Sequence, residues 1–240
     1  MRMTAVAVLL AALAVASPAA TPGAAAPAPG FVALGRVDAG IGQDMRYATA
    51  GNFTGEVVDG YEEPVCLLAR PAAEALRRAQ REVARRGHSL MVYDCYRPRR
   101  AVDRFVRWAR DLRDQRTKAE FYPRVSKDRL VAEGYIAERS GHSRGSTVDV
   151  TLVDLVTRRP LDMGTPFDFF DPLARTDSPW VGAVARANRR LLGEALARQG
   201  FVNLPEEWWH FTHRPEAFPD TCFDFPVSAG FPVPVGAEHR

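Results

Sequence analysis

Two short segments of this 240-residue chain contain most of the side chains that could do chemistry. The first, residues 140–149, reads SGHSRGSTVD, and the second, residues 205–210, reads PEEWWH. They hold His142, Asp149 and His210, and two imidazoles with one carboxylate are a common ligand set of catalytic zinc sites. We therefore interpret these three residues as ligands of one zinc ion. Solvated loop residues of the same types are also common, so spacing alone leaves that alternative open.

The spacing within each segment requires a particular backbone path. His142 and Asp149 are too far apart along a straight strand for their side chains to meet, so the glycines between them must let the loop fold back. Glu207 and His210 would point to opposite faces of a regular strand, so the chain must bend after Pro205. Binding to zinc lowers the pKa of a water molecule to about 7. A carboxylate beside that water can act as general base and then as general acid. We assign that role to Glu207.

The composition is that of an ordinary globular protein, with 46% hydrophobic and 25% charged residues. There are 32 Lys and Arg against 29 Asp and Glu, which gives a net charge of +3. This balance, with basic residues scattered along expected helices, argues against nucleic acid as the main partner.

The first thirty residues differ from the rest of the chain. Arg2 precedes an apolar run over residues 5–16, and an uncharged Pro- and Ala-rich stretch follows to residue 30. This pattern is typical of a secretory signal peptide, and the run is shorter than the ~20 residues that span a bilayer. We expect residues 1–30 to be a signal peptide and leader, cleaved somewhere after about residue 16. Residues 31–240 would then be an exported, periplasmic or secreted domain with no stable membrane anchor. An uncleaved anchor is the alternative.

Three cysteines, Cys66, Cys95 and Cys222, permit one disulfide and one free thiol in an oxidising compartment. The sequence does not decide the pairing, and we favour Cys66–Cys95. None of the three has CxxC spacing, so a cysteine-based zinc site is not expected.

Hydrophobic periodicity predicts the elements that must position the two chemical segments. We expect helices over 71–86, 98–113 and 180–199 with a short one over 126–134, and strands over 90–93, 147–153 and 208–212. Trp208 and Trp209 would form apolar walls of the site. Helices and separated short strands, without a regular βαβ rhythm, indicate an α+β fold. We predict a single domain with a small central antiparallel sheet, flanked by helices, and the zinc site at the sheet.

The two segments resemble the His-x6-Asp and Glu-x-Trp-His motifs of the LAS-type zinc peptidases, which act on peptidoglycan peptides. Further segments narrow the resemblance to the VanX-type D-alanyl-D-alanine dipeptidases of peptidase family M15. They are RYAT (46–49), NFTG (52–55), YDCYRP (93–98), DMGTPFD (162–168) and FDFPV (223–227). The resemblance covers about residues 36–227.

The resemblance implies one Zn²⁺ per chain on His142, Asp149 and His210, and hydrolysis of D-Ala-D-Ala with Glu207 as the base. It also implies that Arg97 stabilises the oxyanion, a role that suits a permanently charged donor. Tyr47, Ser140 and Asp168 match positions that hold the substrate, chiefly its ammonium end. Ser140 and Asp168 could equally be loop caps.

The signal peptide departs from the cytoplasmic, resistance-type relatives and suggests salvage of released dipeptide. Residues 118–136 are a candidate lid, or else an ordinary surface excursion. The alternatives are a peptidoglycan D,D-carboxypeptidase or L-Ala–D-Glu endopeptidase of the same group, and a wall-binding module without turnover. Glu207 argues against the module, because such a protein would not need the base.

Overall fold

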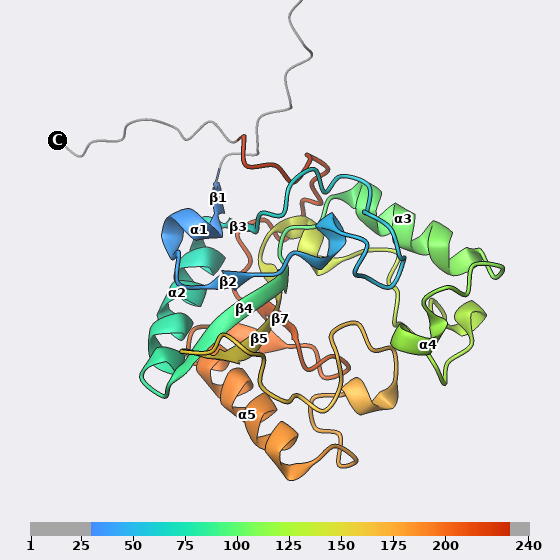
Figure 1. Cartoon of the computed structure of the whole chain (residues 1–240). Coiled ribbons are helices and arrows are strands. Elements are labelled where there is room, and N and C mark those ends of the chain that lie inside the picture. Colours follow the sequence, from blue (N-terminus) through green and yellow to red (C-terminus); the bar gives the residue numbers. More distant parts are fainter. Residues whose placement is uncertain (1–29, 231–240) are drawn as a thin grey trace, which may run out of the picture.

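A computed structural model describes residues 30–230 of the chain (Figure 1). Apart from its last residue, the predicted signal peptide and leader lie outside the described residues, and so does its cleavage site. Within residues 30–230, no helix is both long and apolar enough to cross a membrane.

A five-stranded sheet forms the centre of the molecule. Its strands, in spatial order, are β2 (Gly42–Gln43), β4 (His88–Asp94), β5 (Thr147–Asp154), β7 (His210–His213) and β6 (Phe201–Asn203). Neighbouring strands are antiparallel except for the edge pair β2 and β4, which is parallel. A separate antiparallel pair is formed by β1 (Phe31–Ala33) and β3 (Leu67–Ala69).

The sequence of β5, TVDVTLVD, explains its central place. Successive strand residues point to opposite faces, so Val148, Val150 and Leu152 share one face, and all three are fully buried. Asp149 faces the other side, where polar side chains line a cavity. Alternation along β5 therefore separates the apolar core on one face from the chemistry on the other.

Residues 30–230 contain three longer helices, of which two pack against the sheet. The helix α2 (Arg70–Ala84) has a proline in its first turn and buries Leu76, Ala79 and Val83. It packs against β4 and against α5 (Ala183–Ala197), which contacts β5 and β6. In Figure 1, α3 (Arg99–Arg110) lies away from this helix pair, beyond the other end of β4. Neither α2 nor α5 contributes a residue to the cavity beside Asp149, so this pair supports the sheet and not the site directly.

The remaining helical segments are single turns. They are α1 (Leu34–Val37), α4 (Lys118–Phe121), and the 3-10 turns η1 (Arg46–Ala48), η2 (Lys127–Arg129), η3 (Gly141–Arg144) and η4 (Pro172–Ala174).

The α+β prediction is confirmed, with helices flanking one main sheet. The three long helices and the two long strands lie where the periodicity placed them, although α5 begins at Ala183 and α3 ends at Arg110. The short helix expected over 126–134 is wrong, since only η2 forms there and the Ser126 side chain caps nothing. The last strand begins at His210 and not at residue 208, because a turn occupies the preceding residues.

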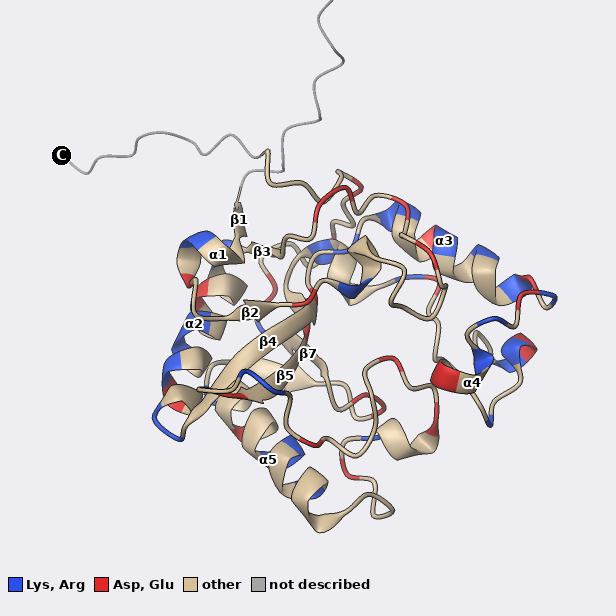
Figure 2. Cartoon of the chain, viewed as in Figure 1, with Lys and Arg blue, Asp and Glu red and all other residues tan. Residues whose placement is uncertain are grey.

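Cys66 and Cys95 form a disulfide, the pairing that we favoured, and Cys222 is a free, half-buried thiol. Basic residues are spread over α1, α2, α3 and α5, with acidic residues near them (Figure 2). This distribution fits the nearly balanced composition.

Candidate metal centre

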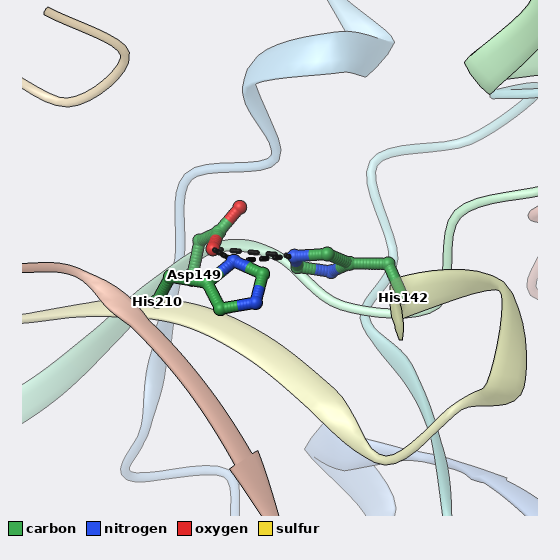
Figure 3. Close-up of side chains that lie close together, drawn as sticks. All are labelled: His142, Asp149 and His210. Atoms are coloured by element: carbon green, nitrogen blue, oxygen red, sulfur yellow. Dashed lines mark hydrogen bonds and ion pairs between the residues drawn. The ribbon is translucent and has the colours of Figure 1, made fainter. Parts of the chain in front are cut away.

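His142, Asp149 and His210 converge on one point (Figure 3). Asp149 and His210 also line the cavity. Asp149 Oδ1 lies 3.2 Å from His142 Nε2 and 3.1 Å from His210 Nδ1. The two imidazole nitrogens are 3.3 Å apart. The structure therefore brings together all three residues that the sequence suggested as ligands.

Strand register explains why Asp149 and His210 lie side by side. Asp149 on β5 is directly opposite His210, the first residue of β7. Residues opposite each other on adjacent strands point to the same face with Cβ atoms about 5 Å apart. A shift of one residue in this register would move one of the two side chains to the other face.

The turn η3 brings His142 back over the strand that follows it. Ser140 caps this turn, its side chain accepting a hydrogen bond from the His142 amide at 3.2 Å. Gly145 ends the turn with φ +75°, and a Cβ there would lie 2.3 Å from the Phe31 ring. A side chain at residue 145 would therefore clash as well as strain the backbone, and glycine allows the loop to fold back as predicted.

The donor set fits a metal ion. His142 Nδ1 lies 2.6 Å from the carbonyl of Cys95, so this nitrogen carries the proton and Nε2 offers its lone pair toward Asp149. Asp149 Oδ1 is buried and makes no hydrogen bond in the described chain. Tetrahedral zinc ligands at 2.0–2.1 Å would be separated from one another by about 3.3 Å, close to the distances seen.

Glu207 lies beside this cluster, with Oε2 3.5 Å from His210 Nδ1. The turn before β7 places it there, since the amide of Glu207 donates to Leu204 O at 3.0 Å. Asn203 fixes the turn by donating from Nδ2 to the carbonyls of Glu207 and His210, each at 3.0 Å. The bend predicted after Pro205 is thus confirmed. Burial raises the pKa of the Glu207 carboxyl to about 7, against the opposing effect of His210.

Arg97 reaches the same cavity from the segment before α3. Its Nε donates to Asp94 Oδ2 at 2.9 Å, and its Nη2 donates to Asp149 Oδ2 at 3.4 Å. The guanidinium also lies 5.1 Å from the ring centres of Tyr47 and Phe105. These contacts hold a positive charge beside the three candidate ligands.

Asp94 is a residue to which the sequence analysis gave no role. It is fully buried, it pairs with Arg97, and its Oδ1 accepts from the Tyr61 hydroxyl at 2.6 Å. Its Oδ2 lies 3.5 Å from His142 Nδ1. The signal was present, because Asp94 stands three residues before Arg97 in the segment YDCYRP.

The three residues suggested for substrate binding all line the cavity. The Tyr47 hydroxyl donates to Asp168 Oδ2 at 2.9 Å, and both residues are buried. Burial, with a smaller contribution from Asp149, raises the pKa of the Asp168 carboxyl well above its usual value. Ser140 is a cap as well as a lining residue. Asp168, at φ +57°, is not a helix cap.

The cavity is small, about 180 Å³. Gly134, Tyr135 and Ile136, from the end of the candidate lid, form part of its wall. Trp209 lines the cavity but Trp208 does not, which corrects the expectation of two tryptophan walls. Trp208 is buried and donates from Nε1 to Thr165 Oγ1 at 2.8 Å.

The chain is similar to known D-alanyl-D-alanine dipeptidases over most of its length. A D-alanyl-D-alanine dipeptidase of Enterococcus faecalis is 42% identical over 199 residues, covering 83% of this chain and 98% of the relative. A D-alanyl-D-alanine dipeptidase of Streptomyces coelicolor is 43% identical over 198 residues, covering 82% and 98%. A solved structure of a mutant of the vancomycin-resistance D,D-pentapeptidase VanY with Zn(II) is 14% identical. It has a TM-score of 0.38 and covers 65% of this chain and 77% of that chain.

The Peptidase M15 family model, described as D-ala-D-ala dipeptidase, matches residues 27–228. This match spans nearly all of the described residues, including every residue of the cavity. The chain therefore belongs to the D-Ala-D-Ala dipeptidase family of peptidases.

Proposed function

We propose that this protein is a zinc-dependent dipeptidase that hydrolyses D-Ala-D-Ala to two molecules of D-alanine. The observation that carries the proposal is the convergence of His142, Asp149 and His210, with the Glu207 carboxylate 3.5 Å from His210. The names of the similar relatives support the choice of substrate.

His142, Asp149 and His210 would hold the zinc ion. When bound, zinc would act as a Lewis acid that polarises the scissile carbonyl and lowers the pKa of water, so that hydroxide, the better nucleophile, is available near neutral pH. Glu207 takes a proton from the attacking water and delivers it to the leaving amine, so the C–N bond breaks as a neutral amine departs. Its raised pKa, about 7, suits a group that must both accept and donate a proton near neutral pH.

Arg97 and the Tyr47–Asp168 pair would act on other parts of the substrate. The Arg97 guanidinium is fixed by Asp94 and can donate to the carbonyl oxygen as negative charge develops there. Asp168 would receive the substrate ammonium. Burial makes the ionised form of Asp168 costly without a partner, so an incoming ammonium would stabilise the carboxylate by pairing with it.

The small cavity favours a dipeptide over a longer peptide. Ligand pockets commonly measure about 300–1,000 Å³, and this cavity of about 180 Å³ lies below that range. A peptide extended at its amino end would also place an uncharged amide where the ammonium of the dipeptide would pair with Asp168, which would leave a buried carboxylate unpaired.

The direct test uses purified mature protein with its zinc content measured. We expect cleavage of D-Ala-D-Ala, little cleavage of L-Ala-L-Ala, and no release of D-alanine from a muramyl pentapeptide. Release of D-alanine from the pentapeptide at a comparable rate would instead support a D,D-carboxypeptidase. Cleavage between L-Ala and D-Glu would support an endopeptidase.

We further propose that the enzyme is exported and salvages dipeptide released outside the cell. Arg2 and the apolar run after it support export, and the Cys66–Cys95 disulfide suits an oxidising compartment. Cell fractionation should recover the protein, lacking its first residues, outside the cytoplasm. A gene deletion should slow growth on D-Ala-D-Ala as nitrogen source. Full-length protein confined to the cytoplasm would contradict the proposal.

A further inference from the structure

The roles proposed so far leave one end of the substrate without a partner. A free dipeptide is a zwitterion, and Asp168 accounts only for its ammonium. The terminal carboxylate must enter a cavity whose wall already carries Asp149, Asp168 and Glu207. The proposed zinc ion would be committed to the water and the scissile carbonyl, so a carboxylate placed among these acidic groups needs a cation of its own.

Two arginines, Arg97 and Arg139, line the cavity. Arg97 is already engaged by Asp94 and Asp149 and lies against two aromatic rings, with its side chain only 13% exposed. Its position is therefore fixed by the protein, and its charge is largely balanced by two carboxylates.

Arg139 is in the opposite situation. It is exposed, and within residues 30–230 its side chain makes no hydrogen bond or ion pair. It directly precedes Ser140, the cap of the turn that carries His142, and it lies at the end of the wall segment that begins at Gly134. An unpaired guanidinium at the rim of an acidic cavity is free to meet an incoming anion.

We propose that Arg139 binds the terminal carboxylate of the substrate. A guanidinium presents two parallel N–H donors that match the two oxygens of a carboxylate. This inference rests on the proposed function and deepens it, because it assigns recognition of the free carboxyl end. A substrate extended at that end, or blocked as an amide, loses the ion pair.

The test compares Arg139→Gln and Arg139→Lys with the wild type and with a matched control, Arg99→Gln. Arg99 is also exposed and lines a neighbouring cavity together with Arg139, but it does not line the one beside Asp149. Each protein is assayed on D-Ala-D-Ala and on D-Ala-D-Ala carboxamide. Binding of D-Ala-D-Ala is measured separately by calorimetry, with each Arg variant placed in a Glu207→Gln background that does not turn over.

We expect Arg139→Gln to raise KM for D-Ala-D-Ala and weaken its binding by roughly 10- to 100-fold, the range for a lost charged hydrogen bond, with a smaller change in kcat. Arg139→Lys should recover part of the loss, and Arg99→Gln should behave as the wild type. The carboxamide should be a poor substrate for the wild type and equally poor for Arg139→Gln.

Two results would contradict the assignment in different ways. If the wild type cleaves D-Ala-D-Ala but Arg139→Gln keeps its KM, its affinity and its preference over the carboxamide, Arg139 does not bind the carboxylate and the proposed function stands. If the zinc-loaded wild type does not cleave D-Ala-D-Ala, the proposed function fails, and the assignment of Arg139 fails with it.

Discussion

At the centre of this protein, hydrogen bonds to one atom of a side chain orient it and leave another of its polar atoms directed at the cluster. His142 uses Nδ1 on the Cys95 carbonyl and keeps Nε2 for the cluster, and Arg97 uses Nε on Asp94. Burial opposes ionisation of Asp149, but His142 and His210 outweigh it and lower the pKa of its carboxyl. Asp149 is therefore ionised at neutral pH, as a metal ligand must be.

The base assignment separates metal binding from turnover. Glu207→Gln keeps the size of the side chain and all three candidate ligands, so zinc content should stay near one per chain. Turnover should fall by about 10²-fold or more, because the amide cannot accept the proton. His142→Ala is the contrasting variant and should lose both zinc and activity. Near-normal kcat in Glu207→Gln, measured beside metal analysis, would remove Glu207 from the role of base.

The oxyanion assignment predicts a loss in kcat more than in KM. Removing a donor of this kind costs about 3–4 kcal/mol in the barrier, so Arg97→Ala should lower kcat by about 10²- to 10³-fold. Arg100→Ala serves as the control, since Arg100 pairs with exposed Asp224 and lies outside the cavity. Steady-state kinetics on D-Ala-D-Ala distinguish the two. An effect confined to KM would mean that Arg97 only binds substrate.

At the scale of elements, the site is made where β5, β7 and the turn η3 meet. Two strands supply Asp149 and His210 through their register, and loops supply the rest. The segment that carries Asp168 has no regular structure, so side chains from other elements must hold it. Arg189 of α5 does so, donating to the carbonyls of Met163, Leu173 and Arg175.

Arg189 is therefore expected to matter for both stability and substrate binding. It is 1% exposed, and burial lowers the pKa of its guanidinium to about 10, which leaves it charged at neutral pH. Arg189→Met would remove the donor of three carbonyls, one in a buried and two in partly buried hydrogen bonds, at a cost of about 3 kcal/mol in the free energy of unfolding. Because Asp168 lies within the freed segment, KM should also rise.

Urea denaturation and kinetics check this expectation, and Arg190→Met is the matched control. Arg190 is the next residue on the same helix and is exposed. Equal unfolding midpoints for the two variants would show that Arg189 is not a structural support.

At the scale of the whole molecule, the disulfide links the segment before β3 to the end of β4. Cys66 and Cys95 are 29 residues apart, and both are fully buried. Closing a loop of that length in the unfolded chain is worth about 3–4 kcal/mol in the chain-entropy account. Cys66→Ala with Cys95→Ala should lower the free energy of unfolding by about that amount, measured with urea. Cys222→Ala, which removes the free thiol, should change it little.

Stability should also depend on pH through His213. Burial, aided by Arg78, lowers the pKa of His213, whose ring packs 5.3 Å from the ring of Phe201. Below about pH 6.5 His213 is therefore protonated in the unfolded chain but still neutral in the folded chain. The free energy of unfolding should decrease as the pH falls below that value.

The comparison of wild type with His213→Phe isolates this contribution from other histidines. The urea midpoint of the wild type should fall more steeply between pH 7.5 and 5.5 than that of His213→Phe, which keeps the aromatic contact. Parallel curves for the two proteins would contradict a role for His213.

The sequence by itself determined the long helices and strands and the candidate ligands, because these features depend on patterns within short segments of the chain. Periodicity located α2, α3, α5, β4 and β5, since each is long enough to repeat its apolar pattern. The types and spacing of His142, Asp149, Glu207 and His210 indicated a metal site before any fold was known. The bend before His210 also followed from spacing alone.

Tertiary structure decided what depends on distant contacts. The strands β2 and β6 are two and three residues long, too short to show a period, and form only because a neighbouring strand pairs with them. Asp94 and Arg189 gained their roles only from the groups that folding placed around them. A side chain's partners are set by the packing of remote segments, and no local pattern encodes that packing.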